Sequence, residues 1–369
     1  MHDVLIIGGG VIGLSLAWDL ARHGQSVHLI DRGEPGREAS WAGAGILPPA
    51  TVRPGQHPSD QLRGLACELH PQWADELRRL TGIDTGYRRC GGLYLGRTPG
   101  EAAALAAWAG TLREEGIAAE RLEPARLAAL EPGLGWRPKG SACAAIYLPE
   151  EAQLRNPRHS KALDAACCQA GVTITPHVTA AEFAVEMNEL QGIETASGLL
   201  RARQYCFTAG AWTGQVLQSL GIATGILPIR GQIVLFRCEQ PPLRRIINEG
   251  SRYLVPRDDG RVLAGSTEEE AGYDKRTTDE AIADLTKFAQ GLVPALQDAA
   301  IEQTWAGLRP GSFDGLPYLG RLPGLKNAYV AAGHFRTGLY LSPATAVVMS
   351  RLLRGDDPQL DLAPFRVGR

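Results

Sequence analysis

The sequence predicts an α/β fold that combines a parallel, nucleotide-binding unit with a second unit built on an antiparallel sheet. Three observations predict this fold. An apolar strand, a glycine-rich turn and a helix follow one another at the N-terminus. Short strands of antiparallel character dominate the middle of the chain, and a strand, a turn and a helix return around residue 333. Because the two kinds of segment alternate along the chain, we expect each unit to be assembled from non-contiguous pieces.

Size and charge exclude several classes of protein. The 369 residues are 44% hydrophobic and 21% charged, with a formal net charge of −2, as in an ordinary globular protein of two or three domain-sized units. No basic block stands out, so no nucleic-acid partner is expected. No stretch reaches the roughly 18 apolar residues of a membrane helix. The seven cysteines include no C-x-x-C pair, which predicts reduced thiols, no metal site and a cytoplasmic location.

The first thirty residues carry the clearest signal. Residues 4–7 form an apolar run typical of a buried parallel strand, and Gly8, Gly10 and Gly13 follow in the G-x-G-x-x-G spacing. These glycines permit a tight turn, admit a pyrophosphate to the backbone and let the next helix pack closely. The helix N-terminus can hold phosphates, and Asp31, at the end of the second strand, can bind a ribose hydroxyl. The order of elements predicts a Rossmann-like dinucleotide-binding domain but does not distinguish NAD from FAD.

Two segments of small residues leave two interpretations open. The stretch "REASWAGAGILPP" (residues 37–49) either lies along a cofactor or forms a flexible loop. In "CFTAGAWTG" (residues 206–214), Gly210 either leaves room for a ring system or only lets two elements pack closely.

The middle of the chain predicts the second unit. The stretches "GGLYLGRT", "ILPIRGQIVLFRCE" and "RYLVPRDDGRVLAGST" are typical of antiparallel strands, and Asp259-Gly260 indicates a hairpin turn. Amphipathic helices are predicted around residues 98–116 and 277–296. A further helix is predicted to begin at Asn156 as its N-cap, with Pro157 in the first position.

The C-terminal third contains an unusual arginine. Arg309 lies in the glycine- and proline-rich stretch "WAGLRPGSFDGLPYLGR", where burial of a guanidinium requires a partner. Either the carboxylate of a ligand or an internal acid such as Asp314 can fill this role. The later stretch "AYVAAGHFRTGLYLSPATA" repeats the strand–turn–helix order and supplies a second helix N-terminus.

Taken together, these motifs resemble those of the D-amino-acid oxidase family of flavoproteins, in particular the branch that oxidises glycine for thiamine biosynthesis. The resemblance rests on "VLIIGGGVIG", "REASWAGAGIL", "FTAGAWTG", "LPIRGQ", "RYLVPRDDGRVLAGST", "WAGLRPGSFDGLPYLGR" and "AAGHFRTGLYLSPATA". It implies a Rossmann-like FAD-binding domain of the D-amino-acid oxidase type and an antiparallel-sheet substrate domain. We expect residues 1–85, 152–222 and 303–369 in the first, and 86–151 and 223–302 in the second.

The resemblance also implies a cofactor site. FAD would be bound non-covalently, since no cysteine lies in the C-terminal third. Beside the glycines, the pyrophosphate would meet Val11 and Ile12, the ribose Asp31 and Arg32, and the adenine the backbone of Val178. The residues expected along the rest of the cofactor are Ala39, Ser40, Ala44, Gly45, Ile46, Gly210, His334, Phe335, Arg336, Thr337, Gly338, Leu339 and Tyr340.

The implied reaction is oxidative deamination of glycine, sarcosine or small D-amino acids by hydride transfer to flavin N5. Arg309 and Tyr253 would hold the substrate carboxylate, and Arg336 would contact the substrate through its backbone or side chain. The products would be a 2-oxo acid such as glyoxylate, ammonia and hydrogen peroxide, with O2 as oxidant. The family also implies a homo-oligomer, a tetramer as in relatives.

Some points stay open at this stage. Glu268 stands where an apolar pocket residue is expected; it either faces the pocket and favours a cationic amine or points to solvent. Ser251 and Ile46 also lie at expected pocket edges. The alternatives to an oxidase are an amino-acid dehydrogenase that uses a quinone or a carrier protein, and a non-catalytic sensor that only binds the cofactor.

Overall fold

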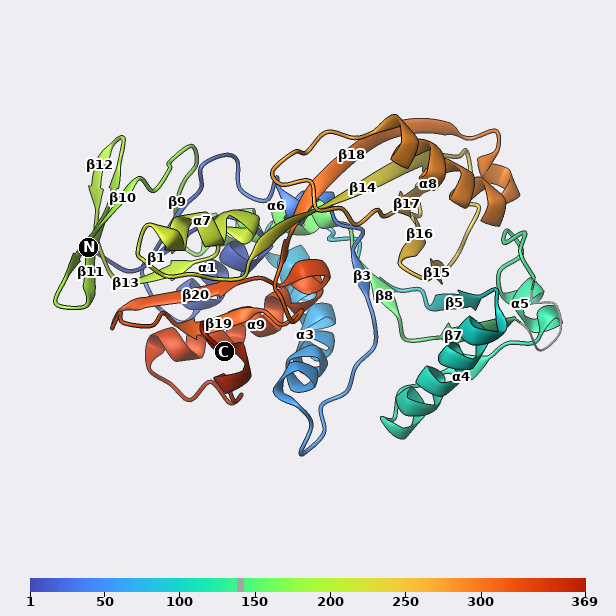
Figure 1. Ribbon diagram of the computed structural model, residues 1–369, viewed down its shortest axis with the longest axis horizontal. Helices are drawn as coiled ribbons and strands as arrows, with labels where there is room; N and C mark the ends of the chain where they lie inside the picture. Colours follow the sequence, from blue (N-terminus) through green and yellow to red (C-terminus); the bar gives the residue numbers. More distant parts are fainter. Residues whose placement is uncertain (138–142) are drawn as a thin grey trace.

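The computed structural model describes residues 1–137 and 143–369 and confirms the predicted α/β fold. The molecule is elongated, with a six-stranded sheet towards one end and an eight-stranded sheet towards the other (Figure 1). Residues 138–142, which belong to the 86–151 segment predicted for the substrate domain, lie outside the described residues. In the described ranges no helix is both long and apolar enough to cross a bilayer.

The six-stranded sheet gathers three distant parts of the chain. Its order is β19-β20-β13-β1-β2-β9; neighbours run parallel except β19, which is antiparallel to β20. The strands are β1 (His2–Ile7), β2 (Val27–Ile30), β9 (Thr173–Thr175), β13 (Ala202–Phe207), β19 (Tyr318–Arg321) and β20 (Ala328–Ala332).

Both faces of this sheet are covered because β1 is apolar on both sides. Val4 and Ile6 point into one core, while Leu5 and Ile7 point into another. Helices α1 (Val11–Arg22), α3 (Pro58–Thr81), α6 (Asn156–Gln169) and α9 (Gly338–Arg354) build the first core. The second core is built with α7 (Thr213–Gln218) and with the small sheet of β10 (Glu182–Glu186), β11 (Glu189–Thr195) and β12 (Gly198–Leu200).

The eight-stranded sheet is antiparallel apart from one parallel pair, β5 with β15. Its order is β18-β14-β17-β16-β15-β5-β7-β6. The strands are β5 (Gly92–Gly96), β6 (Glu120–Arg121), β7 (Ala144–Leu148), β14 (Leu227–Arg237), β15 (Ile246–Glu249), β16 (Arg252–Pro256), β17 (Arg261–Gly265) and β18 (Ala300–Gly311). The β16–β17 pairing confirms the hairpin predicted at Asp259-Gly260.

The two faces of this sheet have different roles. One face packs on α8 (Asp279–Leu292), with α5 (Pro124–Leu130) at its edge. The other carries Ile233, Tyr253 and Leu263, which pack against Ala44 from the N-terminal part of the chain. Three short strands, β3 (Ile46–Leu47), β4 (Arg88–Arg89) and β8 (Ala152–Gln153), connect the two sheets, and α2 (Ala39–Ala42) and α4 (Pro99–Glu114) complete the fold.

The prediction for the start of α6 was wrong in one detail. Arg155, not Asn156, is the N-cap, and Asn156 is already in the helix. Its side chain instead donates a hydrogen bond to the Ser40 carbonyl oxygen at 2.9 Å. A tertiary contact therefore replaces the local capping bond that the sequence pattern favours.

Trp73 of α3 packs edge-to-face on Trp18 of α1, with ring centroids 4.7 Å apart, and both side chains are buried. Trp73→Ala should lower the free energy of unfolding by about 3–5 kcal/mol through lost burial and a cavity. Urea denaturation measures this change. The matched control is Leu80→Ala in the same helix, where the exposed side chain (41%) predicts a loss of about 0.5 kcal/mol. Equal losses in both variants would contradict the packing described.

Candidate active site

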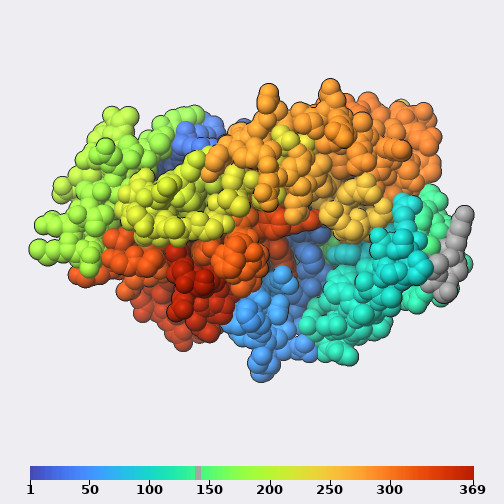
Figure 2. Space-filling view, in the orientation of Figure 1, coloured from blue at the N-terminus to red at the C-terminus, as the bar shows by residue number. Residues whose placement is uncertain are grey.

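A large cavity lies between the two sheets. Its volume is about 680 Å³, within the range of small-molecule sites. Its walls include the N-terminus of α1, the C-terminal loop before α9 and the strand face that carries Tyr253. At its outer end it reaches α3 and α4, and the surface is hollowed between these helices (Figure 2).

The cavity brings together residues predicted from distant motifs. Most of the predicted cofactor and substrate residues line it, and five lie elsewhere. Those at the cavity are Gly10, Val11, Ile12, Ala39, Ser40, Ala44, Gly45, Ile46, Gly210, Tyr253, Arg309, His334, Phe335, Arg336, Thr337, Gly338, Leu339 and Tyr340; Gly8, Gly13, Asp31, Arg32 and Val178 are not at its surface.

The five residues outside the cavity lie in and beside the glycine turn. Asp31 accepts hydrogen bonds from the backbone N–H of Gly9 (2.6 Å) and of Gly33 (2.8 Å), and burial raises the pKa of its carboxyl. The Val178 N–H donates to the Asp31 carbonyl oxygen at 2.8 Å. The Arg32 guanidinium stacks on the Trp212 ring, 3.6 Å from its centroid. The predicted adenosine-binding residues are therefore neighbours.

The glycine turn has the close backbone approach that a dinucleotide needs. Gly8 has a φ of +113°, and a Cβ placed on it would lie 2.5 Å from the Thr208 carbonyl oxygen. A Cβ on Gly13 would lie 2.0 Å from the Gly8 carbonyl oxygen. The Ser40 hydroxyl accepts the Val11 N–H at 2.8 Å, which ties the 37–49 segment to the start of α1. The segment is therefore fixed against the turn, and these residues fit a bound pyrophosphate.

Arg309 has no acidic partner among the residues that the structure describes. Its Nη1 donates to the Thr267 carbonyl oxygen at 3.1 Å, and its Nη2 donates to the Ser266 hydroxyl at 2.6 Å. Burial lowers the pKa of the guanidinium, and the adjacent Tyr253 hydroxyl opposes that shift. The alternative pairing with Asp314 is wrong, because Asp314 binds Arg369 instead. Arg309 therefore carries a positive charge beside the cavity without an ion-pair partner of its own in the described ranges, although the nearby Glu268 carboxylate also opposes the lowering of its pKa.

Two glycines create the space in which Arg309 and Tyr253 meet. A Cβ on Gly231 of β14 would lie 2.2 Å from Arg309 Nη1, and one on Gly265 of β17 would lie 2.7 Å from the Tyr253 hydroxyl. The two side chains thus lie flat across the intervening strands from opposite sides, Arg309 from β18 and Tyr253 from β16. Because the glycines leave no side chain in between, the guanidinium and the hydroxyl face the same space.

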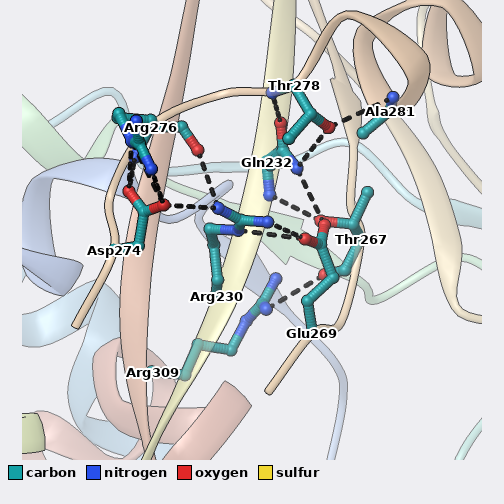
Figure 3. A network of polar contacts seen from close by, with 9 residues as sticks. All are labelled: Arg230, Gln232, Thr267, Glu269, Asp274, Arg276, Thr278, Ala281 and Arg309. Atoms are coloured by element: carbon teal, nitrogen blue, oxygen red, sulfur yellow. Dashed lines mark hydrogen bonds and ion pairs between the residues drawn. The ribbon is translucent and has the colours of Figure 1, made fainter. Parts of the chain in front are cut away.

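Arg230 shows the opposite arrangement close by (Figure 3). Its Nε donates to Glu269 Oε2 at 2.9 Å, its Nη2 binds the same oxygen, and its Nη1 lies 3.6 Å from Asp274. Gln232 joins this network by donating to Glu269 Oε1 at 2.8 Å and accepting the Thr278 N–H at 2.7 Å. The Arg230 charge is therefore neutralised within the protein. The network also fixes the 267–278 segment, whose first carbonyl accepts from Arg309.

Arg336 is also paired, but at the rim of the cavity. Its Nη1 lies 3.2 Å from Glu268 Oε2, and its Nη2 donates to the Ser251 carbonyl oxygen at 3.0 Å. Both side chains remain partly exposed, 37% for Arg336 and 45% for Glu268. Glu268 therefore forms an ion pair with the predicted second pocket arginine, an outcome that neither sequence-based alternative included.

His334 is buried in the C-terminal loop. Its Nε2 lies 3.1 Å from the Thr345 hydroxyl of α9, and burial lowers its pKa to about 3. The imidazole is therefore neutral at physiological pH and holds the loop against the helix rather than carrying a proton.

Comparison with known proteins agrees with this geometry. The family described as FAD dependent oxidoreductase (DAO) matches residues 3–352. The chain belongs to this family. Its cofactor is FAD, and the chain is an oxidoreductase similar to glycine oxidases. It is 38% identical to the glycine oxidase of Pseudomonas putida over 98% of this chain and 97% of the relative.

Solved structures give the same result for the fold. The glycine oxidase of Geobacillus kaustophilus superimposes with a TM-score of 0.93 at 31% identity, covering 100% of this chain and 98% of that one. An iminodiacetate oxidase from Chelativorans sp. BNC1 gives a TM-score of 0.88 at 26% identity, covering 99% of each chain.

Sequence reasoning missed several residues of the site. The sequence does not indicate the roles of Gly231 and Gly265, because each glycine lies against a side chain from another strand. These contacts can be recognised only when the strand register is known. Asn156, expected as a helix cap, lines the cavity and packs against Gly43 and Gly45. Arg257 is buried and donates to the Ala44 carbonyl oxygen at 2.8 Å, which holds the same segment from the other side.

Gly231→Ala tests the space beneath Arg309. The new methyl would displace the guanidinium, since the flexible side chain yields more readily than the strand. We expect weaker binding of a small carboxylate such as acetate, by about 10-fold or more, measured from the perturbation of the bound flavin spectrum. Gly110→Ala in α4, where an added Cβ meets nothing within 4 Å, is the matched control. Unchanged acetate binding in Gly231→Ala would refute this role.

Proposed function

We propose that this protein oxidises glycine and, to a lesser extent, small D-amino acids to the corresponding 2-oxo acid, ammonia and hydrogen peroxide. Sarcosine, a further minor substrate, would give glyoxylate, methylamine and hydrogen peroxide. The observation that carries the proposal is Arg309: a cation in a cavity, held only by neutral acceptors, suits an α-carboxylate. The similarity to glycine oxidases supports glycine as the amine.

We assign the FAD contacts to the residues predicted from the resemblance. The glycine turn, Val11 and Ile12 would hold the pyrophosphate, and Asp31, Arg32 and Val178 the adenosine. The 39–46 segment, Gly210 and the 334–340 loop would enclose the ring system. When bound, FAD accepts the hydride of the substrate α-carbon and returns the electrons to O2.

The chain's own contribution is mainly to position the substrate. Arg309 and Tyr253 would bind the carboxylate, and the rigid sheet beneath them would fix the α-carbon relative to the ring system. His334 is a weak base, because burial lowers its pKa to about 3, and the Thr345 hydroxyl occupies its Nε2. Arg336, paired with Glu268 at the rim, would contact the bound amino acid through its backbone or side chain. The resulting imino acid hydrolyses in water to the 2-oxo acid and ammonia, or to glyoxylate and methylamine when the substrate is sarcosine.

The wider assignments stay predictions. We propose that residues 1–85, 152–222 and 303–369 form the FAD-binding domain and that 86–151 and 223–302 form the substrate domain. A cytoplasmic location follows from the expected reduced cysteines, and a homotetramer and a role in thiamine biosynthesis follow from the resemblance.

Anaerobic reduction of the bound flavin tests the proposal. Glycine should bleach the FAD-loaded protein, and air should restore the colour with release of peroxide. In Arg309→Met, loss of the carboxylate partner should lower kcat/KM for glycine by about 30- to 5000-fold, equivalent to about 2–5 kcal/mol. Arg79→Met, an exposed arginine of α3, is the control.

Three results would contradict the proposal. A flavin that glycine cannot bleach excludes glycine as substrate, and an Arg309→Met variant with wild-type kcat/KM excludes Arg309 as the carboxylate anchor. Fast bleaching with slow reoxidation by O2 but rapid reduction of a quinone or dye would indicate a dehydrogenase instead.

A further inference from the structure

The cavity continues past Tyr253 on the side away from Arg309. Asn248 of β15 lies directly opposite Tyr253 of β16, and Tyr94 of β5 lies opposite Asn248. Residues that are opposite on neighbouring strands point to the same face of a sheet. All three line the cavity, so its floor continues as a row of polar side chains away from the Arg309 end.

Glu151 fixes the orientation of Asn248 through a hydrogen bond on the same face of the sheet. This carboxyl is fully buried and accepts a hydrogen bond from the Tyr94 hydroxyl at 2.6 Å and from Asn248 Nδ2 at 3.2 Å. Within residues 1–137 and 143–369, Glu151 forms no ion pair with a cation. Because an ionised carboxylate only accepts hydrogen bonds, the Asn248 amide must turn its NH2 towards Glu151. Burial raises the pKa of Glu151 to about 7, so the carboxyl is ionised in alkaline buffer.

The opposite end of the amide is therefore available to a ligand. In the described part of the chain no group donates to Asn248 Oδ1, and the side chain borders the cavity. The carbonyl oxygen and the amino group leave the carboxamide carbon in different directions, and Asn248 Oδ1 is not among the buried atoms that lack a partner, so we infer that it faces the cavity. Asn248 thus presents a hydrogen-bond acceptor with a fixed direction, next to the residues that hold the carboxylate.

The cavity wall around this acceptor is apolar, and the one unpaired charge next to it in the described residues is the buried carboxylate of Glu151. Tyr94 packs on Trp108 of α4 with ring centroids 4.7 Å apart, and Leu112 and Ile117 line the same wall. The charged residues farther out are paired: Asp60 lies 3.6 Å from Arg63, and Glu115 lies 3.8 Å from Arg53. This end therefore suits a neutral group with a donor, and a second carboxylate would meet a carbonyl oxygen without a compensating cation.

We propose that Asn248 determines substrate specificity by accepting a hydrogen bond from a neutral O–H or N–H group on a substituent that extends past Tyr253. The proposal rests on the proposed function, because the substrate carboxylate must be held at Arg309. It names a substrate class beyond glycine: amino acids whose side chain or N-substituent carries a hydroxyl or an amide. Glu151 acts through Asn248 and is a positioning residue.

Steady-state kinetics on isosteric substrates test the proposal in alkaline buffer. The pairs are D-serine with D-2-aminobutyrate, and N-(2-hydroxyethyl)glycine with N-propylglycine. Wild type should prefer the hydroxyl-bearing member of at least one pair by about 2- to 12-fold in kcat/KM, the value of one hydrogen bond. Iminodiacetate should be a poorer substrate than N-(2-hydroxyethyl)glycine.

Two variants locate the preference. Asn248→Leu should abolish or reverse it. Glu151→Gln can donate a hydrogen bond to Asn248 Oδ1 and turn the Asn248 NH2 into the cavity, so it should also remove the preference for a donor. A purely structural defect would lower both members of a pair equally and leave their ratio unchanged. Thr111→Val is the control, because this cavity-lining hydroxyl already donates to the Ala107 carbonyl oxygen.

The outcomes separate this proposal from the proposed function. It is overturned if wild type shows no preference in either pair, if none of the four compounds is oxidised, or if the preference survives in Asn248→Leu. Oxidation of glycine together with any of these results leaves the proposed function intact. The protein could also fail to oxidise glycine and still show a preference that depends on Asn248. This result would support the specificity role of Asn248 and reject glycine as the substrate.

Discussion

The positive charge of Arg309, which has no ion-pair partner in the described residues, is the constraint on which the site depends. Placing a guanidinium in a cavity costs free energy unless an anion or several acceptors replace its water. Here the replacement consists of one carbonyl oxygen and one hydroxyl, neither of which cancels the charge. The protein therefore leaves part of this cost to be recovered when an anion binds. The surrounding sheets are stable enough to hold Arg309 in this position, even though its guanidinium is incompletely paired in the free protein.

The contrast with Arg230 explains how neighbouring arginines acquire different roles. Arg230 is saturated by Glu269 and by further contacts, and it serves to fix a loop. Because that loop is fixed, its Thr267 carbonyl stands in a defined position for Arg309 (Figure 3). The fully paired Arg230 thus helps to orient the incompletely paired Arg309 through the Thr267 carbonyl oxygen. Preorganisation of this kind lets a site bind a carboxylate without paying for rearrangement when the ligand arrives.

Much of the fold and part of the site could be predicted from the sequence, because local rules govern them. The turn at Gly8 and Gly13 requires glycine for steric reasons that any Rossmann-like unit shares, and the hairpin at Asp259 follows from turn chemistry. The contacts that shape the cavity depend instead on register between distant strands. Glu151 reaches Asn248 across 97 residues, and no local pattern signals such a pair. Asn156 failed as a predicted cap for the same reason, since a tertiary partner outweighed the local one.

A crystal structure of the FAD-loaded protein with glycolate, which carries the carboxylate of glycine without its amine, tests the central claim most directly. The account predicts both carboxylate oxygens within hydrogen-bond distance of the Arg309 guanidinium, with the Tyr253 hydroxyl contacting one of them. A glycolate bound elsewhere in the cavity, or an Arg309 side chain turned to an acidic residue of the protein, would contradict it.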